Sequence, residues 1–96
     1  MQFLILSRRR MEVFPPEAWT PELIEAEGER VRELYSAGVI RNIWRRKDMP
    51  GAAILMEAAS EDEVRAAAAS LPLARRDMLE VVVVTQLDPY PGFGPR

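Results

Sequence analysis

One acidic residue and a group of arginines are the side chains of this 96-residue sequence best suited to chemistry. Residues 20–38, "TPELIEAEGERVRELYSAG", carry apolar residues at helical spacing, and Glu27 falls inside the apolar stripe. A carboxylate that faces a core has a raised pKa unless a cation or hydrogen-bond donors compensate. Glu27 is therefore a candidate general base. The alternative is a structural glutamate that reaches the helix edge or pairs with Arg30, one turn further on.

Four cations surround a tryptophan in "RNIWRRK", residues 41–47. Side chains alternate between the faces of a strand, so a strand that begins at Val39 has two faces, one with Arg41, Ile43 and Arg45 and the other with Ile40, Asn42, Trp44 and Arg46. Either face brings an arginine toward a covering helix, where it could neutralise Glu27 or hold a ligand carboxylate with two hydrogen bonds. We therefore expect the binding residues to be Arg41, Arg45, Trp44 and Tyr35. The alternative is that the arginines reach solvent and Trp44 is a core residue.

The composition excludes several classes of site. The sequence has no cysteine and no histidine, which removes disulfides, thiolate metal sites and imidazole bases. No Asp or Glu spacing indicates a carboxylate metal site, so we predict no metal. The formal net charge of −2 is not that of a nucleic-acid binder. The segment "GAAILMEA", residues 51–58, also lacks the aromatic residues with which an RNA-recognition motif stacks bases.

The N-terminal segment does not have the pattern of a signal peptide. Its apolar run, residues 3–6, is short, and its charges follow the run instead of preceding it. No stretch reaches the roughly 18 apolar residues that span a bilayer. We expect a cytoplasmic protein that does not enter a membrane.

The elements that must position these side chains follow the order βαββαβ. Helix signals include Thr20 as a cap, Gly38 at the C-terminal end and a Ser60–Glu63 capping box, while Pro72 is expected to end the second helix. The predicted elements are strand 2–8, helix 20–38, strand 39–46, strand 52–58, helix 60–71, strand 78–87 and an irregular tail 88–96. This order is typical of an α+β, ferredoxin-like fold. We expect one domain over residues 1–96, with two helices on one face of a four-stranded antiparallel sheet.

The strands are apolar on both sides. A sheet covered on one face alternates apolar and polar residues, whereas "FLIL", "AAILM" and "VVVV" do not alternate. Two helices cover only one face, so a second copy of the chain is the simplest cover for the other. We therefore predict a homodimer whose sheets pack face to face, as in dimeric α+β barrels. The alternative is a monomer with a solvated apolar face.

Several short motifs occur in a fixed order along the chain. They are a helix ending in Gly38, a strand with Ile43-Trp44-Arg45, then Leu71-Pro72-Leu73 and Leu79-Glu80-Val81. Their order and spacing, over about residues 20–89, resemble the muconolactone delta-isomerase family. Glu27 and Glu29 also fall where members of that family carry acidic residues.

The resemblance implies a ferredoxin-like fold, dimers that associate into decamers, and no metal or organic cofactor. It also implies an enzyme that moves a proton within an anionic butenolide during aromatic catabolism by the β-ketoadipate route. In such an enzyme Glu27 would carry the proton, and Arg41 or Arg45 would anchor the substrate carboxylate.

The chain departs from the family pattern at Ala74-Arg75-Arg76, at Ala52 to Leu55 and at Asp88-Pro89. Family members carry aromatic residues at the first of these places, polar residues at the second and His-Pro at the third. Two other functions therefore stay open. One is a cofactor-free oxygenase on the same barrel, and the other is a non-catalytic oligomeric protein that binds a small molecule.

Overall fold

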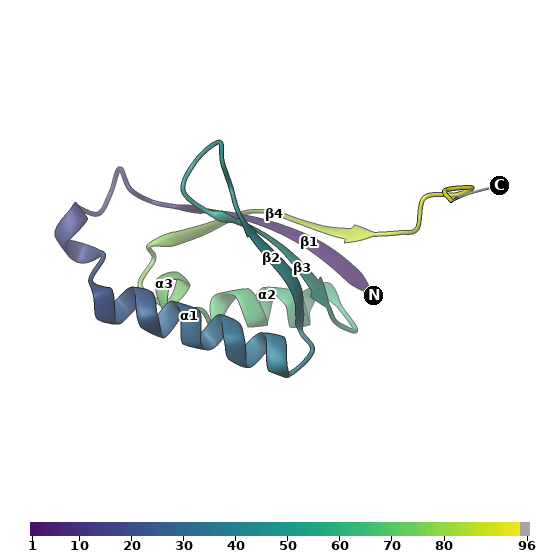
Figure 1. The fold of residues 1–96 in the computed structure, drawn as a ribbon, viewed down its shortest axis with the longest axis horizontal. Coiled ribbons are helices and arrows are strands. Elements are labelled where there is room, and N and C mark those ends of the chain that lie inside the picture. The colour runs from purple at the N-terminus through teal and green to yellow at the C-terminus, as the bar shows by residue number, and fades with distance from the viewer. Residues whose placement is uncertain (95–96) are drawn as a thin grey trace.

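The chain forms a four-stranded sheet with its helices on one face (Figure 1). A computed structural model describes residues 1–94. The elements are β1 (Gln2–Arg9), a 3-10 turn η1 (Pro16–Ala18), α1 (Pro21–Ser36), β2 (Ile40–Arg45), β3 (Ala52–Glu57), α2 (Glu61–Ala69), α3 (Pro72–Arg75) and β4 (Leu79–Leu87). The strand order is β2-β3-β1-β4, and every neighbouring pair is antiparallel. The predicted α+β, ferredoxin-like arrangement is confirmed.

Two helix starts are capped as their sequences predict. The Thr20 Oγ1 accepts a hydrogen bond from the Leu23 N–H at 3.2 Å, and the Ser60 Oγ accepts one from the Glu63 N–H at 3.2 Å. These bonds satisfy N–H groups that have no partner within the first helical turn. Gly38 follows α1 with a φ of +80°, a conformation that glycine adopts without steric cost. The caps fix where α1 and α2 meet the sheet.

The second predicted helix is wrong at its C-terminal end. Instead of one helix over 60–71 that Pro72 closes, α2 ends at Ala69 and Pro72 begins the separate helix α3. Proline suits the first position of a helix, because its fixed φ is helical and its missing N–H has no partner there in any case. The extended residue Leu71 joins the two helices.

The core lies between the helices and one face of the sheet. It is formed by alternate residues of β1 and β3 together with residues of α1, α2 and the β2 start, namely Phe3, Ile5, Ile54, Met56, Leu34, Val64 and Ile40. The intervening residues Leu4, Leu6 and Leu55 therefore point to the opposite face, where Figure 1 shows no covering element. The apolar character of both faces is as predicted.

Two register shifts break the alternation of the edge strands. On β2, Ile40 pairs with Met56 and Asn42 with Leu55, which leaves Arg41 as an extra residue. On β4, Val83 pairs with Leu6 and Val81 with Ser7, which leaves out Val82. Such bulges change which face the following side chains occupy. Ile40 and Ile43 consequently share the helix-covered face, contrary to the faces predicted for a regular strand.

The C-terminal segment continues past β4 without regular structure. Residues 88–94 contain no helix or strand, and Figure 1 shows them extending away from the body of the fold. The rest of the predicted tail, residues 95–96, lies outside the described residues. No helix among residues 1–94 is long and apolar enough to cross a membrane. A cytoplasmic location stays a prediction.

Candidate functional site

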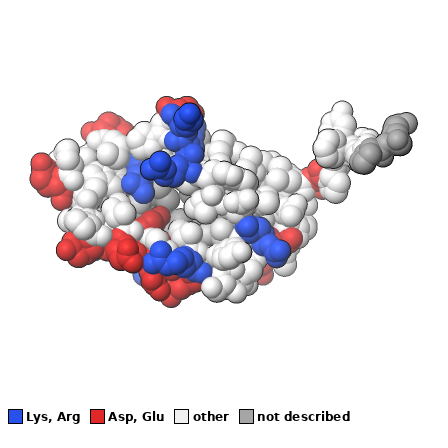
Figure 2. Space-filling view, in the orientation of Figure 1, with Lys and Arg blue, Asp and Glu red and all other residues white. Residues whose placement is uncertain are grey.

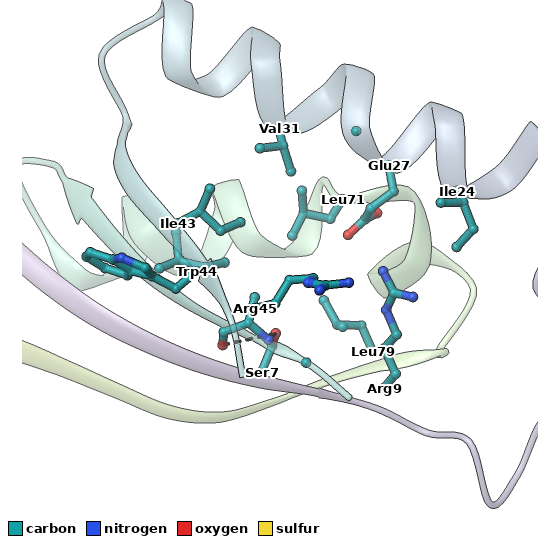
Figure 3. Close-up of a pocket in the computed structure, with 14 residues that line it drawn as sticks. Ser7, Arg9, Ile24, Glu27, Val31, Ile43, Trp44, Arg45, Leu71 and Leu79 are labelled. Carbon is teal, nitrogen blue, oxygen red and sulfur yellow. Dashed lines mark hydrogen bonds between the residues drawn. The ribbon is translucent and has the colours of Figure 1, made fainter. Parts of the chain in front are cut away.

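A cavity of about 310 Å³ lies between α1 and the sheet, near the β2–β3 hairpin (Figure 3). Its walls combine residues from α1, all four strands, the β2–β3 hairpin and the α2–α3 connection. They are Ser7, Arg9, Ile24, Glu27, Gly28, Val31, Ile43, Trp44, Arg45, Gly51, Ala52, Ile54, Leu71 and Leu79. This volume is at the small end of the range for ligand sites in proteins.

Small residues leave room for the cavity. On the sheet side lie Ser7, Gly51 and Ala52, and on the helix side lies Gly28. A Cβ on Gly28 would come within 3.3 Å of the Arg32 Nη1 and touch nothing else closely, so its position borders open space. The buried Ser7 hydroxyl accepts a hydrogen bond from the Ala52 N–H at 3.2 Å, which ties β1 to β3 at the cavity floor.

Glu27 reaches into this cavity from α1 (Figure 3). Its Oε1 accepts a hydrogen bond from the Leu73 N–H at 3.0 Å. Leu73 is in the first turn of α3, where no side chain of the cap residue Leu71 supplies an acceptor, so Glu27 caps α3 from another helix. The predicted alternative, a Glu27–Arg30 pair, is wrong, because the Arg30 guanidinium bonds to the side chains of Ser70 and Glu33.

The environment of Glu27 favours its protonated form. Burial raises the pKa of Glu27, while the Leu73 N–H and the positive charge of Arg9 act in the opposite direction without cancelling the effect of burial. Only Oε1 has a hydrogen-bond partner within the described residues. The carboxylate is thus held by one oxygen, and Oε2 is free to exchange a proton with a ligand.

Arg45 and Trp44 are the predicted β2 residues that line the same cavity. The Arg45 guanidinium points toward the space below Glu27, whereas the Trp44 ring points away from it (Figure 3). Trp44 is paired with Ala53, is 51% exposed and lies toward the sheet face opposite the helices. Trp44 is therefore neither the core residue of the alternative interpretation nor a cap over the cavity.

Arg41 and Tyr35 lie elsewhere. They line a separate shallow groove between the end of α1 and the start of β2, together with Val31, Arg32, Ile40, Asn42 and Ile43. Tyr35 is 63% exposed, and Arg41 is the extra residue of the β2 bulge. The structure thus brings Glu27 together with Arg45 and not with Arg41 or Tyr35. A binding role for these two residues stays a prediction.

Arg9 is a cavity residue that the sequence analysis did not single out. Its guanidinium carbon lies 5.8 Å from the centre of the Trp19 ring, close enough for a cation–π contact. Figure 3 shows the Arg9 guanidinium rising from the end of β1 toward Glu27. The alternation of β1 could have identified it, because Phe3, Ile5, Ser7 and Arg9 fall on one face and the first three are buried.

The charge around the cavity is divided between its two sides. Figure 2 shows basic side chains gathered at the β2–β3 hairpin and acidic side chains along α1. Many of these charges are paired: Arg46 with Asp48, Arg32 with Glu25 and Glu29, and Arg8 with Glu12 and Glu80. Arg9 and Arg45 make no ion pair with any residue between 1 and 94. They are therefore available to a ligand.

This arrangement suits proton transfer on a small anion. A partly buried carboxylate faces two guanidinium groups across an otherwise mainly apolar cavity, and the apolar walls strengthen the electrostatic interactions within it. Within the described part of the chain, no group of three His, Cys, Asp or Glu residues could hold a metal ion. The absence of a metal or organic cofactor stays a prediction.

Comparisons with known proteins give one matching family and two similar solved structures. The sequence pattern of the muconolactone delta-isomerase family matches residues 1–92. No curated protein matches the chain significantly by sequence. A solved structure of muconolactone isomerase is 20% identical with a TM-score of 0.74, over 96% of this chain and 93% of that one. A 5-chloro-2-hydroxyhydroquinone dehydrochlorinase from Burkholderia phenoliruptrix, solved with 2,5-dihydroxybenzoquinone, is 22% identical with a TM-score of 0.65, over 92% and 94% of the two chains.

Proposed function

The chain belongs to the muconolactone delta-isomerase family, and we propose that it moves a proton within a small anionic lactone or related organic acid, so that a double bond shifts without a cofactor. One observation carries this proposal: Glu27 stands on the wall of a cavity, anchored by one oxygen and not paired with Arg30. A non-catalytic module with a filled interior and a Glu27–Arg30 pair would look different.

In the proposed reaction the Glu27 carboxylate removes a proton from the saturated ring carbon that is bonded to the far end of the double bond conjugated to the lactone carbonyl. The C–H electron pair moves through that double bond, and the negative charge collects on the carbonyl oxygen as a dienolate. The Glu27 carboxylic acid then returns the proton to the carbon next to the carbonyl. Nothing is oxidised or reduced, and Glu27 ends in its initial state.

Arg45 would hold the substrate carboxylate during this exchange. Its guanidinium can bind both carboxylate oxygens at once, which fixes the ring relative to Glu27. The names of the two structural neighbours support a reaction that starts with a base, because a double-bond shift and the removal of HCl can both begin when a base takes a proton from carbon. Their names also support a substrate derived from the breakdown of an aromatic ring, as in the β-ketoadipate route.

The experiment that tests the proposal is incubation with muconolactone and related unsaturated lactones. We expect the ultraviolet absorbance of the starting lactone to change, and in D₂O we expect ¹H NMR to show deuterium at the carbon that receives the proton. Glu27→Gln keeps an oxygen acceptor for the Leu73 N–H but cannot act as a base. We expect it to lower kcat by about a hundredfold to ten-thousandfold.

Glu25→Gln is the matched control, since Glu25 lies on the exposed face of α1 and pairs with Arg32. It should turn over the substrate like the unmodified protein. Unchanged turnover in Glu27→Gln would remove Glu27 from the proposed role. No turnover of any lactone by the folded wild-type protein would leave the small-molecule-binding function as the better interpretation.

We also propose that the working form is at least a homodimer. The sheet face opposite the helices carries Leu4, Leu6, Leu55, Val83 and the exposed Trp44 side by side on neighbouring strands. A continuous apolar face of this kind is typical of an interface. A second copy that packs its own sheet on this face would cover it.

A further inference from the structure

Two guanidinium groups share the floor of the cavity, and neither forms an ion pair with any of residues 1–94. Arg9 leaves β1 and Arg45 leaves β2, with β3 lying between these strands. Figure 3 shows both guanidinium groups pointing into the space below Glu27. The nearby arginines of the same strands and hairpin, Arg8, Arg10 and Arg46, are each in an ion pair.

Arg9 is also held in place. Its guanidinium lies over the Trp19 ring, and the Trp19 Nε1–H donates a hydrogen bond to the Phe14 carbonyl at 3.4 Å. Phe14 in turn meets Trp19 edge to face, with ring centres 6.4 Å apart. A cation held over an aromatic ring loses less conformational freedom when it binds a ligand than a free side chain does.

The charges in the cavity can be counted through the proposed reaction. A substrate with one carboxylate gives two negative charges, its own and that of Glu27, opposite the two guanidinium groups. When Glu27 takes the proton it becomes neutral, and the dienolate intermediate then carries both negative charges. The positive charges of Arg9 and Arg45 stay balanced only if each guanidinium lies beside one negative charge of the intermediate.

We propose that Arg9 and Arg45 each bind one of two separate negative charges on the ligand, so the cavity selects doubly anionic molecules over singly anionic ones of the same shape. This inference rests on the proposed function, because it uses the same cavity. It makes Arg45 the partner of the carboxylate and Arg9 the partner of the dienolate oxygen. Interactions that strengthen as the intermediate forms are the ones that accelerate a reaction.

The test compares two ligands that differ in one charge. Phthalate carries two carboxylates on adjacent ring carbons, and phthalamate replaces one of them with a neutral amide of nearly the same shape. Binding to the full-length protein is measured by isothermal titration calorimetry at a pH where phthalate is doubly ionised, and Glu27 is expected to take up a proton as phthalate binds, so that two negative charges again face the two guanidinium groups. We expect phthalate to bind at least about tenfold more tightly, because its second carboxylate adds a hydrogen bond between charged groups that the neutral amide cannot make.

Three variants test which residue causes the preference for phthalate over phthalamate. In Arg9→Gln we expect the ratio of the two affinities to fall to about twofold or less, through loss of phthalate binding alone, since one charge-assisted contact is removed. Arg9→Lys keeps the charge and should retain most of the preference. Arg76→Gln removes the same charge at an exposed position outside the cavity, and it should leave the ratio unchanged.

Equal affinities in the wild-type protein, or no binding of either ligand at millimolar concentration, would overturn the inference. So would an equal loss of preference in Arg76→Gln, because the effect would then come from the overall charge. Since binding is measured without turnover, a retained preference without isomerisation would overturn only the proposed function. Isomerisation without the preference would overturn only this inference.

Discussion

Glu27 makes a structural hydrogen bond and also lines the cavity, where it is the candidate general base. Its Oε1 caps α3 through the Leu73 N–H, which explains why a carboxylate occupies the apolar stripe of α1. The same bond restrains the carboxylate on the cavity wall and leaves Oε2 without a hydrogen-bond partner among residues 1–94. A group that must both give and take a proton gains from such fixed geometry.

The pH dependence of turnover follows from the environment of Glu27. Burial raises the pKa of Glu27, and a general base works only in its ionised form. We therefore expect kcat/KM to rise with pH, with a midpoint above the ordinary range of glutamate, and to be lost as the pH falls through that midpoint. A kcat/KM profile measured from pH 4 to pH 9 would contradict this expectation if it were flat or if it fell with pH.

The sequence identified some of these residues and missed others for physical reasons. Helical periodicity is regular along α1, so it placed Glu27 correctly in the helix face that meets the sheet. Tyr35 was expected among the binding residues, but it is exposed, whereas its neighbour Leu34 in the same last turn of α1 is the residue that packs in the core. Arg9 was not predicted as a cavity residue because it is the last residue of β1. Its contact with Trp19 also depends on the path of the chain between β1 and α1, which the sequence does not show.

At the scale of elements, the cavity depends on how the β2–β3 hairpin meets β1. Gly51 has a φ of +154°, and a Cβ placed on it would lie 2.1 Å from the Ser7 carbonyl oxygen. The Arg9 N–H donates to the Pro50 carbonyl at 2.9 Å, and the Arg46 guanidinium donates to the Ser7 carbonyl at 3.3 Å. Only glycine allows this close approach, which sets the floor beneath Glu27.

We predict that Gly51→Ala destabilises the fold by at least about 2 kcal/mol, because the methyl group forces β1 and the hairpin apart. Gly38→Ala is the control: Gly38 has a φ of +80° but no atom within 4 Å of its would-be Cβ. It should cost only about 1–2 kcal/mol, the cost of a left-handed backbone for a residue with a side chain. The free energy of unfolding is measured by urea denaturation and circular dichroism. Equal losses in both variants would contradict the role of the Ser7 contact.

The order of the four strands and of α1 and α2 could be predicted from the sequence, but the separate helix α3 and the faces of the edge strands β2 and β4 could not. Capping residues are local signals that predicted the starts of α1 and α2, and the βαββαβ order predicted the antiparallel sheet. A bulge depends on the partner strand: the extra residue Arg41 is needed so that both Ile40 and Ile43 lie on the helix-covered face of the sheet. A bulge also explains why the run "VVVV", residues 81–84, does not alternate, because the extra residue Val82 lets Val81 and Val84 both pack against the core.

In the whole molecule, the two faces of the sheet have different surroundings. The helix-covered side holds the core and the cavity, and the opposite side is apolar and has no cover within residues 1–94. Ion pairs border this open face, with Arg8 bound to Glu80 on one strand pair and the N-terminal amine bound to Glu57 on another. An apolar centre with a charged rim is the composition expected of a protein interface.

We predict that the protein sediments as a dimer or larger oligomer at micromolar concentration, because strongly hydrophobic homodimer interfaces bury above about 2,000 Å² and hold together in this range. Leu55→Glu should convert it to monomers, since Leu55 lies at the middle of the open face, beside Leu4. The substitution leaves the helix-side core untouched, so circular dichroism should show an unchanged fold.

Val13→Glu is the matched control for that experiment, because Val13 is 52% exposed in the connection between β1 and η1, away from the open face. It adds the same charge and should keep the oligomer. A wild-type monomer would show that the open face is solvated, and an oligomeric Leu55→Glu protein would move the interface to the sheet edges or the tail. If Leu55→Glu is monomeric and still isomerises lactones, the cavity is complete within a single chain, because no residue of a second copy is then available to it.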